Sequence, residues 1–291
     1  MSSNDASNIK LSGLLLEGRR VIVTGGGSPR GLGLAAARLM AEHGAHVMIT
    51  DVDAAAAEAA AKSLPGDRHF GTRCNVTDKN ECQASVALAL QRFGGQIDVL
   101  VNIAGITSPQ RLMDVTPEAY SLVMDVNMRG TLYMTQAVVP AMRAAKSGSI
   151  VNMSSVSAQR GGGVFGGSHY SAAKAAVLGY TKAAARELGP DNIRVNAICP
   201  SFIDTDITAG MMTPDKLAAV VASVPMAPRR PCARGRRLCA VSGQRPVELC
   251  DGQRDRHQRR VAHSLRRTRN FRRCCAGVAI CLCATASDGT S

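Results

Sequence analysis

Short apolar runs alternate with longer segments of helical periodicity along the first two hundred residues. The apolar runs are typical of buried strands, and we expect strands at residues 19–26, 46–51, 68–76, 97–105, 148–155 and 193–200. Helical segments separate them, and Gly44 and Pro65 mark the ends of two of these segments. We expect the helices at residues 31–45, 54–64, 77–93, 117–143 and 168–188.

This order of elements predicts the fold class. Strands separated by helices of this length pair in parallel through right-handed crossovers. The sequence therefore predicts an α/β fold, a doubly wound parallel sheet with helices on both faces.

Composition separates the chain into two parts. Residues 229–291 contain 15 of the 35 Lys and Arg residues, 4 of the 22 Asp and Glu residues and seven of the ten cysteines. The first 228 residues then carry a net charge of only +2 and three scattered cysteines, Cys74, Cys82 and Cys199. That spacing indicates neither a disulfide framework nor a zinc site, so we expect no bound metal.

Length and hydropathy narrow the class of protein. The 291 residues, 45% of them apolar, are enough for one large domain or two small ones. The polar opening has no secretory signal, and we expect residues 1–13 to be a flexible lead-in. Because no apolar run approaches the roughly 20 residues of a membrane span, we expect a cytoplasmic protein with no membrane partner.

Glycines cluster where the first predicted strand meets the first helix, in the segment TGGGSPRGLG at residues 24–33. Glycine permits a tight turn, lets the backbone approach a pyrophosphate and lets helix and strand pack closely. The amino end of the helix then presents N–H groups to the phosphates. A glycine cluster alone is weak evidence, but its place at the first turn of a βαβ unit favours a dinucleotide-binding loop.

Asp51 ends the second predicted strand, 18 residues after Gly33. A carboxylate there accepts hydrogen bonds from both hydroxyls of the adenosine ribose and repels a 2′-phosphate, which favours NAD over NADP. The alternative role for Asp51 is to cap the next helix, which Asp53 could do equally well. Arg30 argues in the other direction, because a cation in this loop could meet a 2′-phosphate.

Tyr170 and Lys174, in the segment YSAAK, are four residues apart and lie on one face of a predicted helix. A phenol is a poor base at neutral pH, with a pKa of about 10, but a nearby ammonium stabilises the phenolate. The pair can then take the hydroxyl proton of a secondary alcohol while hydride leaves the same carbon. Ser155 closes the fifth predicted strand, and its hydroxyl can stabilise charge on the substrate oxygen.

At this point the sequence resembles the short-chain dehydrogenase/reductase family, in particular its 3-oxoacyl-carrier-protein-reductase-like members, from about residue 14 to residue 228. That family has a Rossmann-like fold. The motifs that carry the resemblance are the phosphate loop, NIAG at 102–105, DVNMRG at 125–130, IVNMSSVSA at 150–158, YSAAK at 170–174 and IRVNAICPSFIDT at 193–205.

The resemblance implies a catalytic set of Asn127, Ser155, Tyr170 and Lys174. In this set Asn127 holds a water that relays protons towards Lys174, which also binds the nicotinamide ribose. The resemblance further implies that residues 75 and 76 flank the adenine and that residues 203 and 205 meet the carboxamide. The full set of implied cofactor-binding residues is Thr24, Gly25, Gly31, Leu32, Gly33, Asp51, Asn75, Val76, Asn102, Ala104, Gly105, Tyr170, Lys174, Pro200, Ile203 and Thr205.

The chain departs from the family pattern in several places, none of which removes a catalytic group. The phosphate loop has two residues, Pro29 and Arg30, beyond the commonest spacing. Asn75 stands where aspartate is usual, and Ser201 stands where glycine usually follows the proline. The segment GGGVFGG at 161–167 lengthens the spacing between the catalytic serine and tyrosine, which puts the shape of the substrate pocket in doubt. Ser154 is the alternative to Ser155.

The tail at residues 229–291 contains fifteen arginines and no lysine. It begins where the family should supply one more helix and a last strand. Three explanations of this tail are possible. It could bind nucleic acid or acidic lipid, it could be inert and disordered, or it could result from a shifted reading frame. Synonymous codons for residues 236–262, with suitable wobble bases, read one base forward as DVCALFLASDQSSYVTGNVIDINGGWL, which resembles the missing end. We expect a frameshift near residues 229–232, genuine or a sequencing error, which leaves a disordered tail and no last strand.

The sequence thus predicts an NAD-dependent oxidoreductase that interconverts a secondary alcohol and a ketone. A substrate lid is expected near residues 202–226, with Met211 and Met212 on it and a helix started by Thr213 and Pro214. The runner-up is an NADP-dependent 3-oxoacyl thioester reductase, and an arginine-tail nucleic-acid binder on an inactive scaffold is the alternative of another class. The intact catalytic set argues against that last reading, so the expected partners are a small alcohol or ketone, no nucleic acid, and a second or fourth copy of a frame-corrected chain.

Overall fold

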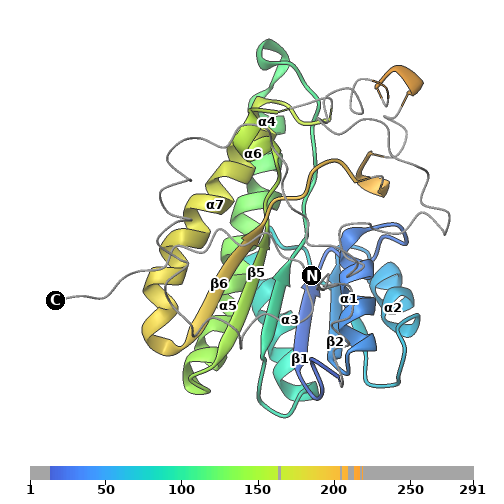
Figure 1. Cartoon of the computed structure of the whole chain (residues 1–291), viewed down its shortest axis with the longest axis vertical. Helices are drawn as coiled ribbons and strands as arrows, with labels where there is room; N and C mark the ends of the chain where they lie inside the picture. The colour runs from blue at the N-terminus through green and yellow to red at the C-terminus, as the bar shows by residue number, and fades with distance from the viewer. Residues whose placement is uncertain (1–13, 163–164, 204, 209–212, 217, 219–291) are drawn as a thin grey trace, which may run out of the picture.

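The computed structural model of the chain describes residues 14–162, 165–203, 205–208, 213–216 and 218. Six parallel strands form one sheet in the order β3-β2-β1-β4-β5-β6 (Figure 1). The order reverses direction between β1 and β4, which makes a topological switch point at their carboxyl ends. The strands are β1 (Arg20–Thr24), β2 (His46–Asp51), β3 (Phe70–Arg73), β4 (Val99–Asn102), β5 (Gly148–Met153) and β6 (Ile193–Ile198).

Helices cover both faces of this sheet, which confirms the predicted doubly wound α/β fold. They are α1 (Leu32–Glu42), α2 (Ala54–Lys62), α3 (Lys79–Arg92), α4 (Pro117–Met124), α5 (Gly130–Ala144), the one-turn α6 (Ser157–Arg160) and α7 (Ser168–Leu188). Short turns of other helical types are η2 (Leu112–Asp114), η3 (Asp125–Arg129), η4 (Gly189–Asp191) and η5 (Asp206–Thr208).

Alternation along the strands divides the core into two layers. In β1, Val21 and Val23 face α1 and α2, whereas Ile22 faces the layer that contains α3, α5 and α7. All three side chains are completely buried. A strand with apolar residues on both faces is typical of a parallel sheet that helices cover on each side.

The observed elements follow the predicted ones closely. Strand β2 and helix α7 have the predicted bounds, and the other elements are shorter than predicted by a few residues. The predicted helix at 117–143 is interrupted by the π-helical turn η3, and α6 was not predicted. Residues 219–291, which include the predicted frameshift tail, and Met211 and Met212 lie outside the described residues.

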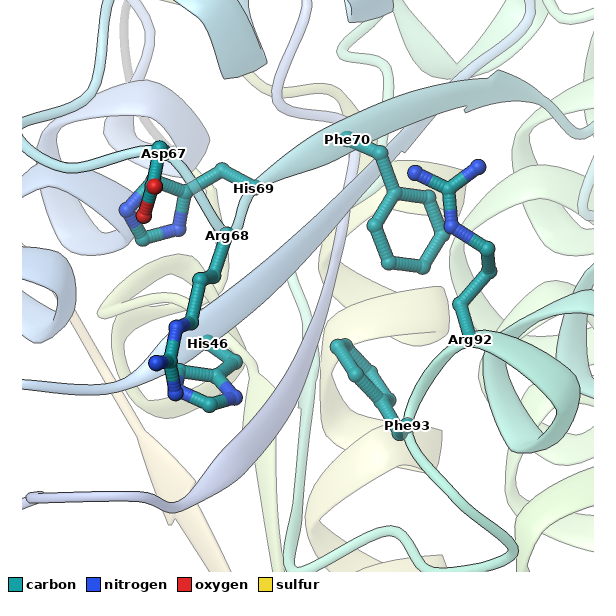
Figure 2. A pocket seen from close by; sticks show the side chains of 7 residues that line it. All are labelled: His46, Asp67, Arg68, His69, Phe70, Arg92 and Phe93. Atoms are coloured by element: carbon teal, nitrogen blue, oxygen red, sulfur yellow. The ribbon is translucent and has the colours of Figure 1, made fainter.

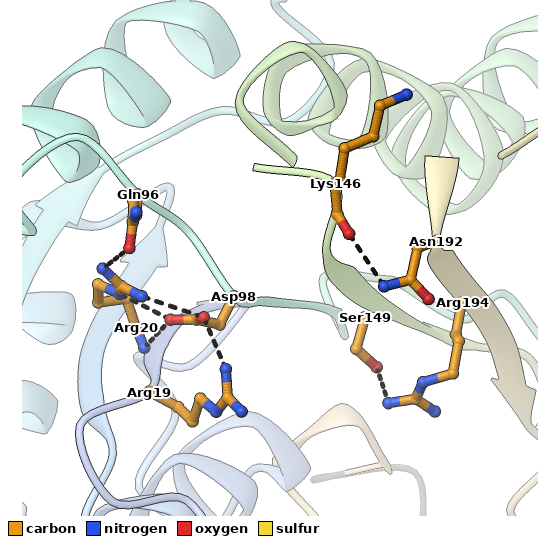
Figure 3. Close-up of polar contacts among 8 residues, drawn as sticks. All are labelled: Arg19, Arg20, Gln96, Asp98, Lys146, Ser149, Asn192 and Arg194. Carbon is orange, nitrogen blue, oxygen red and sulfur yellow. Dashed lines mark hydrogen bonds and ion pairs between the residues drawn. The ribbon is translucent and has the colours of Figure 1, made fainter. Parts of the chain in front are cut away.

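Polar side chains join the amino ends of the strands (Figure 3). Asp98, just before β4, accepts hydrogen bonds from the backbone N–H of Arg20 at 2.9 Å and from its Nε at 2.6 Å. Across the sheet, Arg194 in β6 donates to the hydroxyl of Ser149 in β5 at 3.1 Å. Burial alone would raise the pKa of Asp98, but its hydrogen bonds from Arg20 and Arg19 hold the pKa below its ordinary value. This end of the sheet is therefore built for stability.

A hollow of about 420 Å³ lies at the start of β2 and β3 (Figure 2). The rings of Phe70 and Phe93 pack against each other there, with their centres 5.3 Å apart. The guanidinium carbon of Arg92 lies 4.7 Å from the centre of the Phe70 ring. Burial, followed by the charge of Arg68, lowers the pKa of His46. Ligands of open α/β sheets bind outside the carboxyl ends of the strands, whereas this hollow lies at the amino ends. We therefore interpret it as a surface depression between packed side chains and not as a ligand site.

Candidate active site

A cleft of about 980 Å³ opens at the carboxyl ends of the strands. Every strand contributes to its wall through the loop or residue that follows it. The lining residues include Gly25, Ser28, Gly31, Leu32, Asp51, Asn75, Val76, Ala104, Gly105, Ser155, Tyr170, Lys174, Pro200, Ile203, Thr205 and Asp206. The cleft thus forms at the switch point that the strand order creates.

The phosphate loop forms one wall of the cleft and has little room for side chains. Gly25 has a positive φ of 68°, and a Cβ there would lie 2.6 Å from the Cα of Ala104. A Cβ on Gly33 would collide with the backbone of Gly25 and Gly26. Helix α1 begins after Gly31 without a capping side chain. The N–H groups of its first turn therefore remain available to an anion.

Thr24 holds this loop against the neighbouring one. Its hydroxyl accepts hydrogen bonds from the backbone N–H groups of Ile103 and Ala104, each at 3.1 Å. Thr24 is itself buried, as are Gly33 and Asn102. The structure therefore places these three predicted cofactor residues behind the cleft wall, where they set its shape.

Asp51 lies on the cleft wall at the end of β2. Its Oδ2 accepts from the backbone N–H of Gly27 at 2.9 Å, and a Cβ on Gly27 would lie 2.8 Å from the Asp51 Cγ. The neighbouring Asp53 caps α2, because its Oδ1 accepts from the N–H of Ala56 at 3.1 Å. The cap that was the alternative role for Asp51 is thus supplied by Asp53.

Asn75, Val76 and Thr77 continue the wall beyond β3. The side-chain oxygen of Asn75 accepts from the N–H and the hydroxyl of Thr77 at 3.1 and 2.9 Å. Its backbone N–H donates to Glu81 at 2.8 Å. These bonds fix the loop, and the side chain of Val76 packs against Gly130, where a Cβ would lie 2.6 Å away from it.

Tyr170 and Lys174 face the cleft from α7, as the four-residue spacing predicts. The Lys174 Nζ donates to the carbonyl of Met153 at 2.9 Å and lies 5.8 Å from the centre of the Tyr170 ring. Ser155 lines the same cleft from the loop after β5, and its hydroxyl oxygen accepts from the N–H of Ser157 at 3.1 Å. The Ser154 hydroxyl is buried and donates to the carbonyl of Lys174 at 2.7 Å.

Burial shifts the pKa of both α7 groups. It raises the pKa of Tyr170, and a hydrogen bond with Ser155 acts in the opposite direction. Burial also lowers the pKa of Lys174 to about 8, with Cys199 acting in the opposite direction. A phenol and an amine with shifted pKa values beside each other in a cleft are a marker of acid–base function.

Asn127 lies behind Lys174, in the π-helical turn η3. Its Nδ2 donates to the carbonyls of Ile106 and Val123, both at 2.9 Å, while its Oδ1 is buried and unpartnered among the described residues. A Cβ on Gly105 would lie 2.7 Å from this oxygen and 3.3 Å from the Lys174 Nζ. The two polar atoms therefore both lie next to Gly105. A π turn inside a helix frequently marks a functional position.

The segment after β6 closes the far side of the cleft. Pro200, Ser201, Phe202, Ile203 and Thr205 line it. Phe202 stacks on Phe165 with ring centres 5.4 Å apart. The hydroxyl of Thr107 donates to the carbonyl of Phe165, which ties the residue-165 loop to the loop after β4. The apolar side chains of Leu122, Val126, Phe165 and Phe202 are all among the lining residues of the cleft.

Several lining residues were not named from the sequence. Ser28, Ser157, Arg160, Phe165, Phe202, Asp206 and Thr208 belong to this group. Three of them lie in loops and four lie in the short turns α6 and η5, so no periodic pattern marks them. Thr213 does act as the predicted helix cap, since its hydroxyl accepts from the N–H of Lys216 at 3.3 Å.

Four features of the cleft are compatible with a bound dinucleotide. Its volume lies within the range of ligand sites, the glycine loop leaves space where phosphates would approach, Asp51 lies on the wall, and the Asn127 oxygen is an orphaned acceptor beside Lys174. Among the described residues no group of three or more His, Cys, Asp or Glu side chains is arranged to hold a metal ion. None of the described helices combines the length and hydropathy of a membrane span.

Comparison with known proteins gives concordant results. A family model described as enoyl-(acyl carrier protein) reductase matches residues 25–231. An uncharacterized short-chain type dehydrogenase/reductase, y4mP, from Sinorhizobium fredii is 46% identical over 216 residues, which is 73% of this chain and 85% of that protein. The 3-oxoacyl-[acyl-carrier-protein] reductase FabG of Chlamydia muridarum is 42% identical over 200 residues, 68% of this chain and 79% of that one. The crystal structure of gox2181 superposes with a TM-score of 0.69 at 34% identity, over 73% of this chain and 83% of that one.

Proposed function

This chain belongs to the short-chain dehydrogenase/reductase family and is an NAD(P)-dependent oxidoreductase, and we propose that it interconverts a secondary alcohol and a ketone with NAD. The observation that carries the proposal is that Ser155, Tyr170 and Lys174 all line one dinucleotide-sized cleft.

The phosphate loop and the first turn of α1, where Leu32 lines the cleft, would hold the pyrophosphate through backbone N–H groups. Asp51 would bind the adenosine ribose, and Lys174 the nicotinamide ribose. Residues 75 and 76 would flank the adenine, and Ile203 and Thr205 would meet the carboxamide. When bound, the nicotinamide supplies an acceptor for the hydride that leaves the alcohol carbon.

Tyr170 exchanges the proton of the substrate oxygen. In the reductive direction its phenol donates a proton to the ketone oxygen, and in the oxidative direction its phenolate takes the hydroxyl proton. The raised pKa of Tyr170 keeps the phenol protonated at neutral pH, which suits reduction. Oxidation is then expected to accelerate as the pH rises through the alkaline range.

Ser155 holds the substrate oxygen by a hydrogen bond and stabilises charge on it. We assign this role to Ser155 and not to Ser154, whose hydroxyl is buried and bonded to the Lys174 carbonyl. Lys174 favours the phenolate of Tyr170 through its charge. The Asn127 Oδ1, which has no partner among the described residues, and the Lys174 Nζ both lie next to Gly105, which supports a role of Asn127 in proton relay.

The preference for NAD rests on two carboxylates. Asp51 on the cleft wall would repel a 2′-phosphate. Arg30, the loop cation that would favour NADP, forms an ion pair with Asp206 at 3.7 Å. This ion pair partly neutralises the charge of Arg30 and so weakens its attraction for a 2′-phosphate.

An NADP-dependent 3-oxoacyl thioester reductase is the second candidate. The similarity to FabG of Chlamydia muridarum favours it, as do the apolar lining residues Leu122, Val126, Phe165 and Phe202. Such side chains suit an acyl chain as well as a compact apolar ketone. The choice of cofactor separates the two candidates.

A substrate panel tests the proposal. The purified chain is assayed with secondary alcohols in the presence of NAD+ or NADP+, and with the matching ketones and 3-oxoacyl thioesters in the presence of NADH or NADPH. The absorbance of the reduced nicotinamide follows both directions. We expect turnover of simple alcohols and ketones with a preference for NAD. Turnover confined to 3-oxoacyl thioesters with NADP would establish the second candidate in its place.

A further inference from the structure

A carboxylate joins the phosphate loop to the segment after β6, two parts of the chain 178 residues apart. Asp206, the first residue of η5, accepts a hydrogen bond at its Oδ2 from the hydroxyl of Ser28 at 2.6 Å and from the N–H of Arg30 at 3.1 Å. Its Oδ1 lies 3.7 Å from the Nε of Arg30. One side chain thus makes three polar contacts with the loop predicted to bind phosphate.

This contact lies at the cleft. Ser28 on one side and Thr205, Asp206 and Thr208 on the other are all lining residues. The phosphate loop follows β1 and the η5 turn follows β6, so the two form separate walls. A bond between these walls encloses whatever occupies the space between them.

The η5 turn presents the carboxylate in a defined position. The N–H and the hydroxyl of Thr208 both donate to the carbonyl of Thr205 at 3.1 Å, and both threonines are buried. The hydrogen bond from the Ser28 hydroxyl, followed by that from the Arg30 N–H, lowers the pKa of Asp206. Asp206 is therefore an anion at neutral pH, and its bonds to the loop are charge-assisted.

We propose that Asp206 is a clasp residue, which holds the η5 turn against the phosphate loop over the bound dinucleotide and slows the release of the cofactor. The proposal rests on the proposed dinucleotide function. Asp206 is a positioning residue in this account, because it acts through the closure of the cleft and not on the reacting atoms.

The same contacts allow an alternative role for Asp206, in which its carboxylate blocks the site of a cofactor phosphate. A hydroxyl, a backbone N–H and a guanidinium are also typical receptors for a phosphate. If the carboxylate occupied the place of a cofactor phosphate, it would have to leave before the cofactor could bind. Removing its charge would then speed cofactor binding and tighten the complex, the opposite of what a clasp predicts.

The test is the release of NADH from the full-length chain, followed by fluorescence in a rapid-mixing instrument with an excess of NAD as the chase. We expect Asp206→Asn and Ser28→Ala each to release NADH about fivefold to tenfold faster, the order for a charge-assisted hydrogen bond in a partly exposed place. Association rates should change by less than about twofold. Because the two groups form one contact, the double variant should release NADH no faster than about twice the rate of Asp206→Asn.

Asp215→Asn is the matched control. Asp215 is also an exposed carboxylate after β6, and this variant should release NADH at the wild-type rate. Release at the wild-type rate from Asp206→Asn and Ser28→Ala, or tighter binding by Asp206→Asn, would overturn the clasp. Either result would leave the oxidoreductase proposal standing. Failure of the wild-type chain to bind NADH or NADPH would overturn both.

Discussion

Asp51 and Asp53 are two residues apart, yet the structure gives them different surroundings. Asp53 caps helix α2, while Asp51 lies on the cleft wall and accepts the N–H of Gly27. The sequence could place both near the adenosine end of a cofactor but could not assign the cap. Substitutions at Asp51 therefore test the choice of cofactor, and the same substitutions at Asp53 serve as a control that affects only the cap of helix α2.

Asp51→Ser is expected to narrow the preference for NAD over NADP by about 1–3 kcal/mol, the range for a hydrogen bond to a charged group. The reason is the loss of the ribose contact together with the loss of repulsion against a 2′-phosphate. Dissociation constants for both cofactors measure this. Asp53→Ser should keep the preference of the wild-type chain, and an unchanged ratio in Asp51→Ser would favour the NADP-dependent candidate.

Lys174 is a site where function opposes stability. Burial lowers its pKa to about 8, so the folded chain binds its proton less readily than the unfolded chain, in which a lysine has a pKa of about 10.4. The unfolded state then binds more protons between these two values, and stability rises with pH across that window. Below about pH 8 the full penalty of the buried charge is present.

Lys174→Met is accordingly expected to raise the free energy of unfolding by about 2 kcal/mol at pH 7, after allowance for the lost bond to Met153. The advantage should shrink above pH 8 and reverse before about pH 10.4, where the lost bond to Met153 outweighs the remaining penalty of the buried charge, while turnover is lost throughout. Denaturant unfolding at several pH values measures it. A variant less stable than the wild type at pH 7 would show that Lys174 is bound more favourably than its burial implies.

At the scale of elements, long periodic segments were the predictable part of the molecule. The bounds of β2 and α7 match because apolar alternation and helical spacing are local properties of residues 46–51 and 168–188. The π turn at Asp125–Arg129 was not predictable, since it depends on how Asn127 bonds to Ile106 and Val123. The presence of Tyr170 and Lys174 on one face of a helix was predictable from their spacing. The Asp206 contact joins two segments that are distant in the sequence, and no sequence pattern marks it.

The amino ends of β1 and β4 provide a prediction at this scale. Asp98→Asn is expected to cost about 1–3 kcal/mol at neutral pH, because Arg20 keeps a half-buried guanidinium without its carboxylate. The pKa of Asp98 is lowered in the folded chain, so its contribution is present above the unfolded value of about 3.9 and is lost as the pH falls through the lower folded value.

Unfolding of wild type and Asp98→Asn between neutral and acid pH measures this contribution. The gap between the two chains should close below about pH 4. A gap that persists at low pH would assign the stabilisation to packing and not to the carboxylate charge.

At the scale of the whole molecule, the Arg-rich tail is the part of the sequence that departs from the family pattern. The family match ends at residue 231, close to the proposed extra base in the codons for residues 229–232. Strand β6 is the last strand in the described sheet order. We propose that a one-base shift replaced the last helix and strand of the family fold with the Arg-rich tail.

Deleting one base in those codons is expected to give a chain ending in a YVTG…DINGGWL segment. The restored strand would pair a sheet edge and the restored helix would bury apolar surface, at about 25 cal/mol per Å². We expect higher solubility, cooperative unfolding at a higher temperature, and a dimer or tetramer in gel filtration. Resequencing of the gene addresses the sequencing-error alternative. A corrected chain that gains nothing would mean that the arginines belong to the protein.

The central claim is that Tyr170 exchanges a proton with the substrate in an NAD-linked oxidoreductase. The most direct measurement compares the NADH dissociation constant and the turnover number of Tyr170→Phe with those of Tyr180→Phe, a partly buried tyrosine on the same helix. We predict that Tyr170→Phe keeps NADH affinity within about twofold and loses at least about a hundredfold in turnover, the usual order for a general acid–base group. Tyr180→Phe should retain both. Turnover in Tyr170→Phe comparable to the wild-type rate would contradict the account.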